Sequence, residues 1–333
     1  MSKNTTPGPF NLITDVSSIL VGNAVDEGAK TGATVLRCAR SFITAVDIRG
    51  GGPGTRETDA LSSESLIGRC DAIVLSGGSV FGLAAADGVA SALSHENIGL
   101  RLGEKGPAIP IVPAAILHDL TNDGDKNWGA NPPYRELGAQ ALNNAGVSFD
   151  LGNSGAGFGA MAGTKKGGLG SSSITLENGT TLGALVAVNP VGSVYMPDGK
   201  TFYAWPWEIE NEFGGHAPPK QRDNADPFPE HSRLNKSTPE NSNTVIAIIA
   251  TNADLSNVEA KRVAIMAHDG IARAIRPAHT PFDGDTVFTI ATGDISLEDT
   301  SPAARHYEIT RIGSAASDCL ARAIARGVFE AQR

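Results

Sequence analysis

The feature that most constrains how this chain folds is an abrupt change of character at residue 244. Nearly forty residues, 205–242, contain six prolines and many charges with almost no apolar periodicity. Structureless loops longer than about 12 to 15 residues are uncommon inside a compact domain and are usually functional or disordered. The next segment, 244–251, reads Thr-Val-Ile-Ala-Ile-Ile-Ala-Thr and is as apolar a strand as the chain contains. A polar tether therefore leads directly into a predicted core strand.

Short apolar strands and amphipathic helices alternate along much of the remaining chain. Strands are predicted at 34–47, 72–75, 173–176, 181–188, 244–251 and 286–290, and helices at 81–93, 135–145, 258–275 and 312–323. One helix has a defined start, because Ser256 and Glu259 have the capping-box spacing, and it must end before Pro277. The 333 residues fit one large α/β domain or two modest ones.

The composition excludes several classes of protein. Hydrophobic residues make up 41% and charged residues 19%, and no apolar run approaches the roughly 18 residues that a membrane-spanning helix needs. A membrane protein and a disordered chain are therefore not expected. The net charge of −9, without any basic block, also argues against a protein that neutralises nucleic-acid phosphates. The expected partner is a small molecule or a peptide.

Neither the cysteines nor the histidines indicate a cross-linked or metal-binding protein. Cys38, Cys70 and Cys319 lie far apart and form no CxxC pair, and the seven histidines show no HxxxH spacing. The Asp283-Gly284-Asp285 segment is too short for a calcium loop. The N-terminus lacks the charged and apolar parts of an export signal. We therefore expect buried thiols, no metal, no cofactor and a cytoplasmic location.

Glycine is over-represented and clustered, with 39 residues in the chain. The turn around Gly77 and Gly78, at a predicted helix start, either binds an anion through backbone N–H groups or is an ordinary strand-to-helix turn. Residues 155–160 match a G-x-G-x-x-A pattern, but the strand and helix that a dinucleotide site needs are not predicted around them. No G-x-S-x-G elbow occurs, so a serine hydrolase of that type is not expected.

Position 244 has two interpretations from pattern alone. A threonine at the head of a buried strand is usually a β-former, and it can also be a nucleophile. Five motifs in the same order favour the second interpretation: Arg-Gly-Gly-Gly-Pro-Gly-Thr-Arg-Glu-Thr-Asp at 49–59, Ser-Gly-Gly-Ser-Val-Phe-Gly-Leu at 76–83, Ile-Pro-Ile-Val-Pro-Ala-Ala at 109–115, Asn-Pro-Val-Gly at 189–192 and Asp-Gly-Asp-Thr at 283–286. Over roughly residues 20 to 330 the chain thereby resembles the DmpA-type aminopeptidase family, which includes β-aminopeptidases and nylon-oligomer hydrolases.

The resemblance implies a fold and a maturation step. The family is built as a four-layer αββα sandwich of the DmpA and ornithine acetyltransferase type, and it cleaves itself just before a nucleophile at the start of a core strand. For this chain it implies one catalytic domain, 1–333, cut between Asn243 and Thr244 into an α chain, 1–243, and a β chain, 244–333. Residues 205–243 would form the processing loop. The two chains would stay together and assemble as a homo-oligomer, a tetramer of αβ units.

The resemblance also implies the site residues. Thr244 matches the nucleophile, Asp283 and Asp285 match the acids that orient it, and Asn189 matches a contributor to the oxyanion site. A family lysine near the nucleophile falls on either Lys165 or Lys166. Where the nylon-oligomer hydrolases have a functional tyrosine, this chain has His118. The resemblance thus predicts a site assembled from segments that lie far apart in the sequence.

The chemistry of an N-terminal threonine agrees with this assignment. A free α-amino group has a pKa of about 7.7 to 8.0, so it can take the proton of the Thr244 hydroxyl near neutral pH. The side-chain amide of Asn189 can donate to the tetrahedral oxyanion, and such a donor contributes on the order of 3 kcal/mol to lowering the barrier. No catalytic histidine is required. The predicted reaction is hydrolysis of short amides or peptides that have a free amino end.

Two alternatives remain open from the sequence. An ornithine acetyltransferase type would pass the acyl group to an amine, but its usual Ala-Thr-Met-Leu is replaced here by Asn-Thr-Val-Ile at 243–246. An uncleaved metabolite-binding protein of the same fold would have lost the nucleophile or the acids, and none is missing. We predict that His118, Asp119, Gly77 and Gly78 contact the substrate. The carboxylate of Asp119 either holds the substrate's amino group or only caps local structure.

Overall fold

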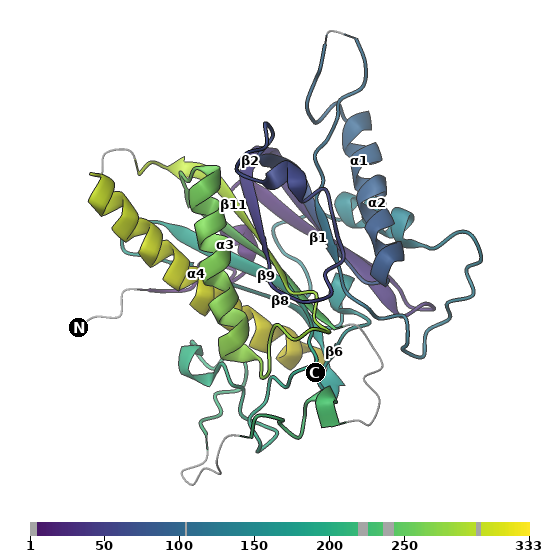
Figure 1. The fold of residues 1–333 in the computed structure, drawn as a ribbon, viewed down its shortest axis with the longest axis vertical. Coiled ribbons are helices and arrows are strands. Elements are labelled where there is room, and N and C mark those ends of the chain that lie inside the picture. The colour runs from purple at the N-terminus through teal and green to yellow at the C-terminus, as the bar shows by residue number, and fades with distance from the viewer. Residues whose placement is uncertain (1–4, 104, 219–225, 236–242, 298–300) are drawn as a thin grey trace.

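The computed structural model describes residues 5–103, 105–218, 226–235, 243–297 and 301–333. Its strands are β1 (Ile19–Asp26), β2 (Thr31–Ile48), β3 (Thr55–Arg56), β4 (Arg69–Ser76), β5 (Ala114–Ile116), β6 (Met161–Ala162), β7 (Lys165–Lys166), β8 (Gly168–Thr175), β9 (Thr181–Asn189), β10 (Thr244–Ala253) and β11 (Thr286–Ile295). Its α-helices are α1 (Ala85–His95), α2 (Tyr134–Asn143), α3 (Asn257–Ala274) and α4 (Pro302–Ala331). Figure 1 shows α3 and α4 on one side of the strands and α1 and α2 on the other.

The long strand β2 joins two layers of sheet. Its N-terminal half pairs with β1 and β4, and its C-terminal half pairs with β11. The register with β4 shifts between Arg37 and Phe42, where the strand is irregular. One layer therefore contains β1, β4, β5 and β3, and the other contains β11, β10, β9 and β8.

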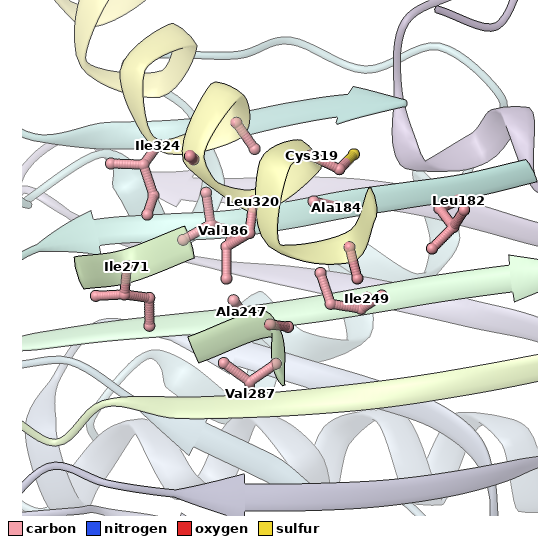
Figure 2. Packing of buried hydrophobic residues seen from close by; sticks show 14 of the residues in the cluster. Leu182, Ala184, Val186, Ala247, Ile249, Ile271, Val287, Cys319, Leu320 and Ile324 are labelled. Carbon is pink, nitrogen blue, oxygen red and sulfur yellow. The ribbon is translucent and has the colours of Figure 1, made fainter. Parts of the chain in front are cut away.

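Three hydrophobic cores separate four layers. The outer cores lie between α1 and α2 and the first sheet layer, and between α3 and α4 and the second. The central core lies between the sheet layers, where Leu36 and Ile73 of the first meet Leu185, Ile246 and Phe288 of the second. Figure 2 shows the core beneath α3 and α4, with Ile271 and Leu320 packed over the alternate residues of the strands. The order is αββα, as predicted.

Strand β10 occupies the interior of the second layer. It runs antiparallel to β9 and parallel to β11, so it is hydrogen-bonded on both edges. Side chains of a strand alternate between its faces, so Val245 points toward the helices and Ile246 toward the other sheet. Thr244 lies two residues before Ile246, so its side chain is on the same face of the strand. The predicted nucleophile therefore stands at the inner edge of the central core.

Most predicted elements are confirmed, with some differences. The helix predicted at 81–93 begins as a 3₁₀ turn, Ser79–Ala84, and becomes α-helical only at Ala85. Strand β1 was not predicted. All three cysteines are buried free thiols, as expected. In the part of the chain that the structure describes, no helix is long and apolar enough to cross a membrane.

The segment predicted to be a tether is partly anchored. Phe213 is buried in the core under the helices, and Glu212 forms an ion pair with Arg322 of α4 at 2.5 Å. The sequence pattern gave no sign of this anchor, because a single aromatic and a single buried acid carry no periodicity. Residues 219–225 and 236–242 of the predicted processing loop lie outside the described residues.

Candidate active site

The predicted cleavage point lies where β10 begins, and it is held by backbone hydrogen bonds. The Thr244 side chain is 3% exposed, and its hydroxyl donates to the carbonyl oxygen of Asn243 at 2.5 Å. The same carbonyl oxygen accepts the N–H of Gly284 at 2.8 Å, while the N–H of Asn243 donates to Phe282 at 2.9 Å. The hydroxyl thus lies against the peptide bond that it would attack, and a donor already faces that carbonyl.

The two acids flank Gly284, and each is 1% exposed. Oδ1 of Asp285 accepts the N–H of Val245, the residue after Thr244, at 2.8 Å. Oδ2 of Asp283 accepts the N–H and the hydroxyl of Thr280 at 2.8 and 2.6 Å. Burial raises the pKa of Asp283, and the nearby charge of Asp285 raises it further. Both carboxylates therefore lie beside the start of β10.

Asn189 is the cross-strand partner of Thr244 in the register of β9 and β10. Side chains of such partners share one face of the sheet, so the amide and the hydroxyl lie on the same side. Its Oδ1 accepts the N–H of Met161 at 2.9 Å, and its Nδ2 donates to the carbonyl of His118 at 3.1 Å. Because an amide nitrogen carries two donors, one bond to His118 does not exhaust its capacity.

Arg233 lies ahead of Asn243 in the chain, and its guanidinium holds the turn after Asn189. Its Nη2 donates to the carbonyls of Asn189 and Pro190 at 3.2 and 2.7 Å, and its N–H donates to Val191 at 2.9 Å. Asp283 accepts the N–H of Val191 from the opposite side at 3.3 Å. Burial lowers the pKa of Arg233 to about 10, although the charge of Asp283 opposes the shift.

Of the predicted substrate contacts, Gly77 and Gly78 lie at the turn that follows β4, and Asp119, which follows β5, bonds to this turn. Asp119 is 3% exposed, and its oxygens accept the N–H of Gly78 at 2.7 Å and the hydroxyl of Thr31 at 2.6 Å. The N–H of Gly77 donates to the carbonyl of Gly32 at 2.9 Å. These contacts give Asp119 a structural role in holding the turn, and they engage the N–H groups expected to bind an anion. A substrate role for this turn stays a prediction.

His118 lies next to this turn and is half-buried. Burial lowers the pKa of His118, and the positive charge of Arg233 lowers it further. The imidazole is therefore favoured in its neutral form at neutral pH. Its backbone carbonyl, bonded to Asn189, connects the turn to the strands that carry Thr244. The substrate contact predicted for His118 also stays a prediction.

The two candidate lysines lie on a short hairpin whose other strand contacts Asn189 through the N–H of Met161. Lys165 and Lys166 form the exposed strand β7 of a short hairpin, and the Lys166 ammonium lies 5.6 Å from the centre of the Phe158 ring. Among the contacts of the described residues, neither lysine bonds to Thr244 or to the acids of the Asp-Gly-Asp motif. The structure thus brings together the threonine, the asparagine and both acids, and the role assigned to a lysine stays a prediction.

Sequence reasoning missed three groups at this site. They are the N–H of Gly284, the guanidinium of Arg233 and the imidazole of His279, whose Nδ1 lies 2.7 Å from Oδ2 of Asp285. For His279 the one available signal was its closeness in the sequence to Asp285, which follows it by six positions. The described residues contain no group of three or more His, Cys, Asp or Glu side chains placed to hold a metal ion.

Comparison with known proteins shows the family of this chain. The model of peptidase family S58 matches residues 11–333. An uncharacterized aminopeptidase of Mycobacterium tuberculosis is 43% identical, covering 97% of this chain and 95% of its own length. A 6-aminohexanoate-oligomer endohydrolase of Agromyces sp. is 32% identical, covering 92% of this chain and 82% of its own.

Solved structures show the same fold. A β-aminopeptidase of Burkholderia sp. superimposes with a TM-score of 0.65 at 20% identity, over 97% of this chain and 87% of that one. An L-aminopeptidase D-Ala-esterase/amidase of Ochrobactrum anthropi, whose structure is a variant of the Ntn hydrolase fold, gives 0.70 at 19% identity, over 98% and 88%. With this fold and nearly the whole length matched, the chain belongs to peptidase family S58 and is an aminopeptidase-like hydrolase of peptide or other amide bonds.

Proposed function

We propose that this hydrolase matures by cutting itself between Asn243 and Thr244 and then uses Thr244 as an N-terminal nucleophile. The observation that carries the proposal is a pair of hydrogen bonds to one carbonyl oxygen. The oxygen of Asn243 accepts both the Thr244 hydroxyl and the Gly284 N–H. A hydroxyl beside a peptide carbonyl, with a fixed donor on the carbonyl oxygen, is the arrangement that an N-to-O acyl shift needs.

The proposed self-cleavage has two steps. The Thr244 oxygen attacks the carbonyl carbon of Asn243, and the Gly284 N–H stabilises the negative charge that develops on the carbonyl oxygen. The C–N bond then breaks, the departing nitrogen takes up the proton that the hydroxyl has lost, and an ester joins Asn243 to the threonine oxygen. Water hydrolyses the ester, which leaves a carboxylate on Asn243 and a free α-amino group on Thr244.

In the cut protein, the new amino group serves as the base for substrate hydrolysis. It takes the proton of its own hydroxyl as that oxygen attacks the substrate's amide carbonyl. Asp283 and Asp285 orient the amino group by charge and hydrogen bonding, and the Asn189 amide donates to the oxyanion. The amine product leaves with a proton, and water then releases the acyl group from Thr244.

The proposed substrates are short amides or peptides with a free amino end. The relatives support this class, because their names describe aminopeptidases and a hydrolase of 6-aminohexanoate oligomers. We propose water rather than an amine as the acyl acceptor. Release of p-nitroaniline from β-alanine or L-alanine p-nitroanilide, compared with acetyl transfer from N-acetylornithine to glutamate, tests this choice.

Sequencing and mass spectrometry of the purified protein test the cleavage. We expect chains of 243 and 90 residues, the smaller beginning Thr-Val-Ile-Ala. Thr244→Ala removes the nucleophile and should leave the chain whole and inactive, whereas Thr244→Ser keeps a hydroxyl and should still cut. An active preparation that contains only the intact chain, or an Ala variant that cuts normally, would refute the proposal.

A further inference from the structure

His279 directs two hydrogen bonds to one oxygen of Asp285. Its ring Nδ1 lies 2.7 Å and its backbone nitrogen 3.1 Å from Oδ2. The backbone nitrogen donates, and the ring nitrogen donates as well in the tautomer that carries its proton on Nδ1. The other oxygen of Asp285 accepts the N–H of Val245. The carboxylate is therefore held between the loop that carries His279 and the first residues of β10.

The backbone of His279 is strained to make this contact. Its φ is +54°, in the left-handed region that residues with a Cβ rarely adopt. In this conformation the main-chain N–H and the ring of one residue converge on the same carboxylate oxygen. Such strain persists only where surrounding contacts over-determine it, and it clusters at functional sites. Nothing in the proposed chemistry of Thr244 itself accounts for this strained residue.

The ring of His279 is also held from behind. It packs edge-to-face on the ring of His268 in α3, with centroids 5.0 Å apart. The side chain of His268 is fully buried, and its Nε2 lies 3.1 Å from the carbonyl oxygen of Asp47 in β2. Burial lowers the pKa of His268 to about 4, so this ring is neutral at neutral pH and adds no charge beside His279. The plane of the His279 ring is thus set by packing.

We propose that His279 is a positioning residue for the nucleophile, which holds the Asp285 carboxylate in the orientation that receives the α-amino group of Thr244. The inference rests on the proposed function, because that amino group exists only in the cut chain. His279 acts through Asp285, and no step of the reaction transfers a proton to it. Loss of its ring should therefore lower turnover and leave substrate affinity unchanged.

Two substitutions separate the ring donor from the backbone strain. His279→Gly removes the donor and accepts a positive φ without a steric penalty. His279→Asn keeps a side-chain N–H near the position of Nδ1, and asparagine tolerates the left-handed region. His306→Asn, on the exposed surface of α4, is the matched control. Each variant is purified, its fraction of cut chain and its unfolding temperature are measured, and kcat and KM are determined on the alanine p-nitroanilide that the wild type hydrolyses.

We expect His279→Gly to lower kcat by about tenfold to a hundredfold with KM within about twofold, since orientation is lost and binding is not. His279→Asn should recover most of the loss, and His306→Asn should match the wild type. Wild-type kcat in His279→Gly, or an equal loss in both His279 variants, would overturn the inference. A wild-type chain that stays uncut refutes the proposed function itself, whereas a cut and active wild type with an unaffected His279→Gly refutes only the role of His279.

Discussion

Replacing Gly284 by alanine is expected to slow self-cleavage without removing any hydrogen-bond donor. A Cβ on Gly284 would lie 2.8 Å from the Thr244 hydroxyl oxygen, whereas ordinary contacts begin at 3.4 Å, so the two atoms must separate by about 0.6 Å. The methyl group cannot retreat, because the backbone of Gly52 and Pro53 lies 2.9 and 3.2 Å from it. A misplacement of about 1 Å can cost a hundredfold in rate, so this shift predicts a loss of roughly tenfold to a hundredfold.

The assay follows the conversion of intact to cut chain after cell-free synthesis, by gel densitometry. Gly103→Ala is the matched control, since a Cβ there has no neighbour within 4 Å among the described residues. The unfolding temperature of the uncut Thr244→Ala background, with and without each alanine, shows whether the fold is kept. Cleavage of Gly284→Ala at the wild-type rate, or an equal slowing by Gly103→Ala, would refute the argument that the hydroxyl is confined at this position.

Three further predictions concern the two acids and the ion pair between Glu212 and α4. Asp283→Asn and Asp285→Asn should each lower kcat about a hundredfold while the fold is kept. Loss of activity on addition of EDTA, with recovery on addition of calcium, would contradict this role of the acids. Burial and the charge of Asp285 raise the pKa of Asp283, so Asp283 becomes protonated at a pH above the ordinary aspartate value of about 3.9. Asp285→Asn removes the like charge and should lower the pKa of Asp283. The acid limb of the residual kcat/KM of this variant should therefore move to lower pH. Glu212→Ala should destabilise the protein by about 3–5 kcal/mol in urea unfolding, since it leaves the buried Arg322 guanidinium unpaired, whereas Glu330→Ala at the surface pair with Arg333 should cost at most about 1 kcal/mol.

The fold was predictable where local pattern and packing agree. The apolar run from Thr244 identified the interior strand, and the capping box at Ser256 located the start of α3, because burial and capping leave marks at fixed spacing. Strand β1 and the irregularity of β2 near Arg37 could not be read in this way. Both depend on which strands pair, and a β-rich segment looks the same whether it stays in one sheet layer or joins two.

The site was predictable only in part, for a related reason. Thr244 and the two acids stand directly at strand ends, where a motif and a strand start coincide. Arg233 reaches the same site from a short 3₁₀ turn and His279 from a loop, and their partners are backbone carbonyls and a carboxylate fixed by tertiary structure. No periodicity links those residues to the groups they contact. The role that the resemblance implies for Lys165 or Lys166 stays a prediction.

If the chain cleaves itself as proposed, the interior position of β10 makes cleavage depend on correct folding. The carbonyl of Asn243 meets the distant Gly284 N–H only when β10 lies in its place between β9 and β11. A chain with that ladder unformed would keep its amide and lack the amino group that hydrolysis needs. Activity would therefore appear only in molecules that have completed their sheet, and misfolded copies would remain inert precursors that cannot hydrolyse cellular peptides.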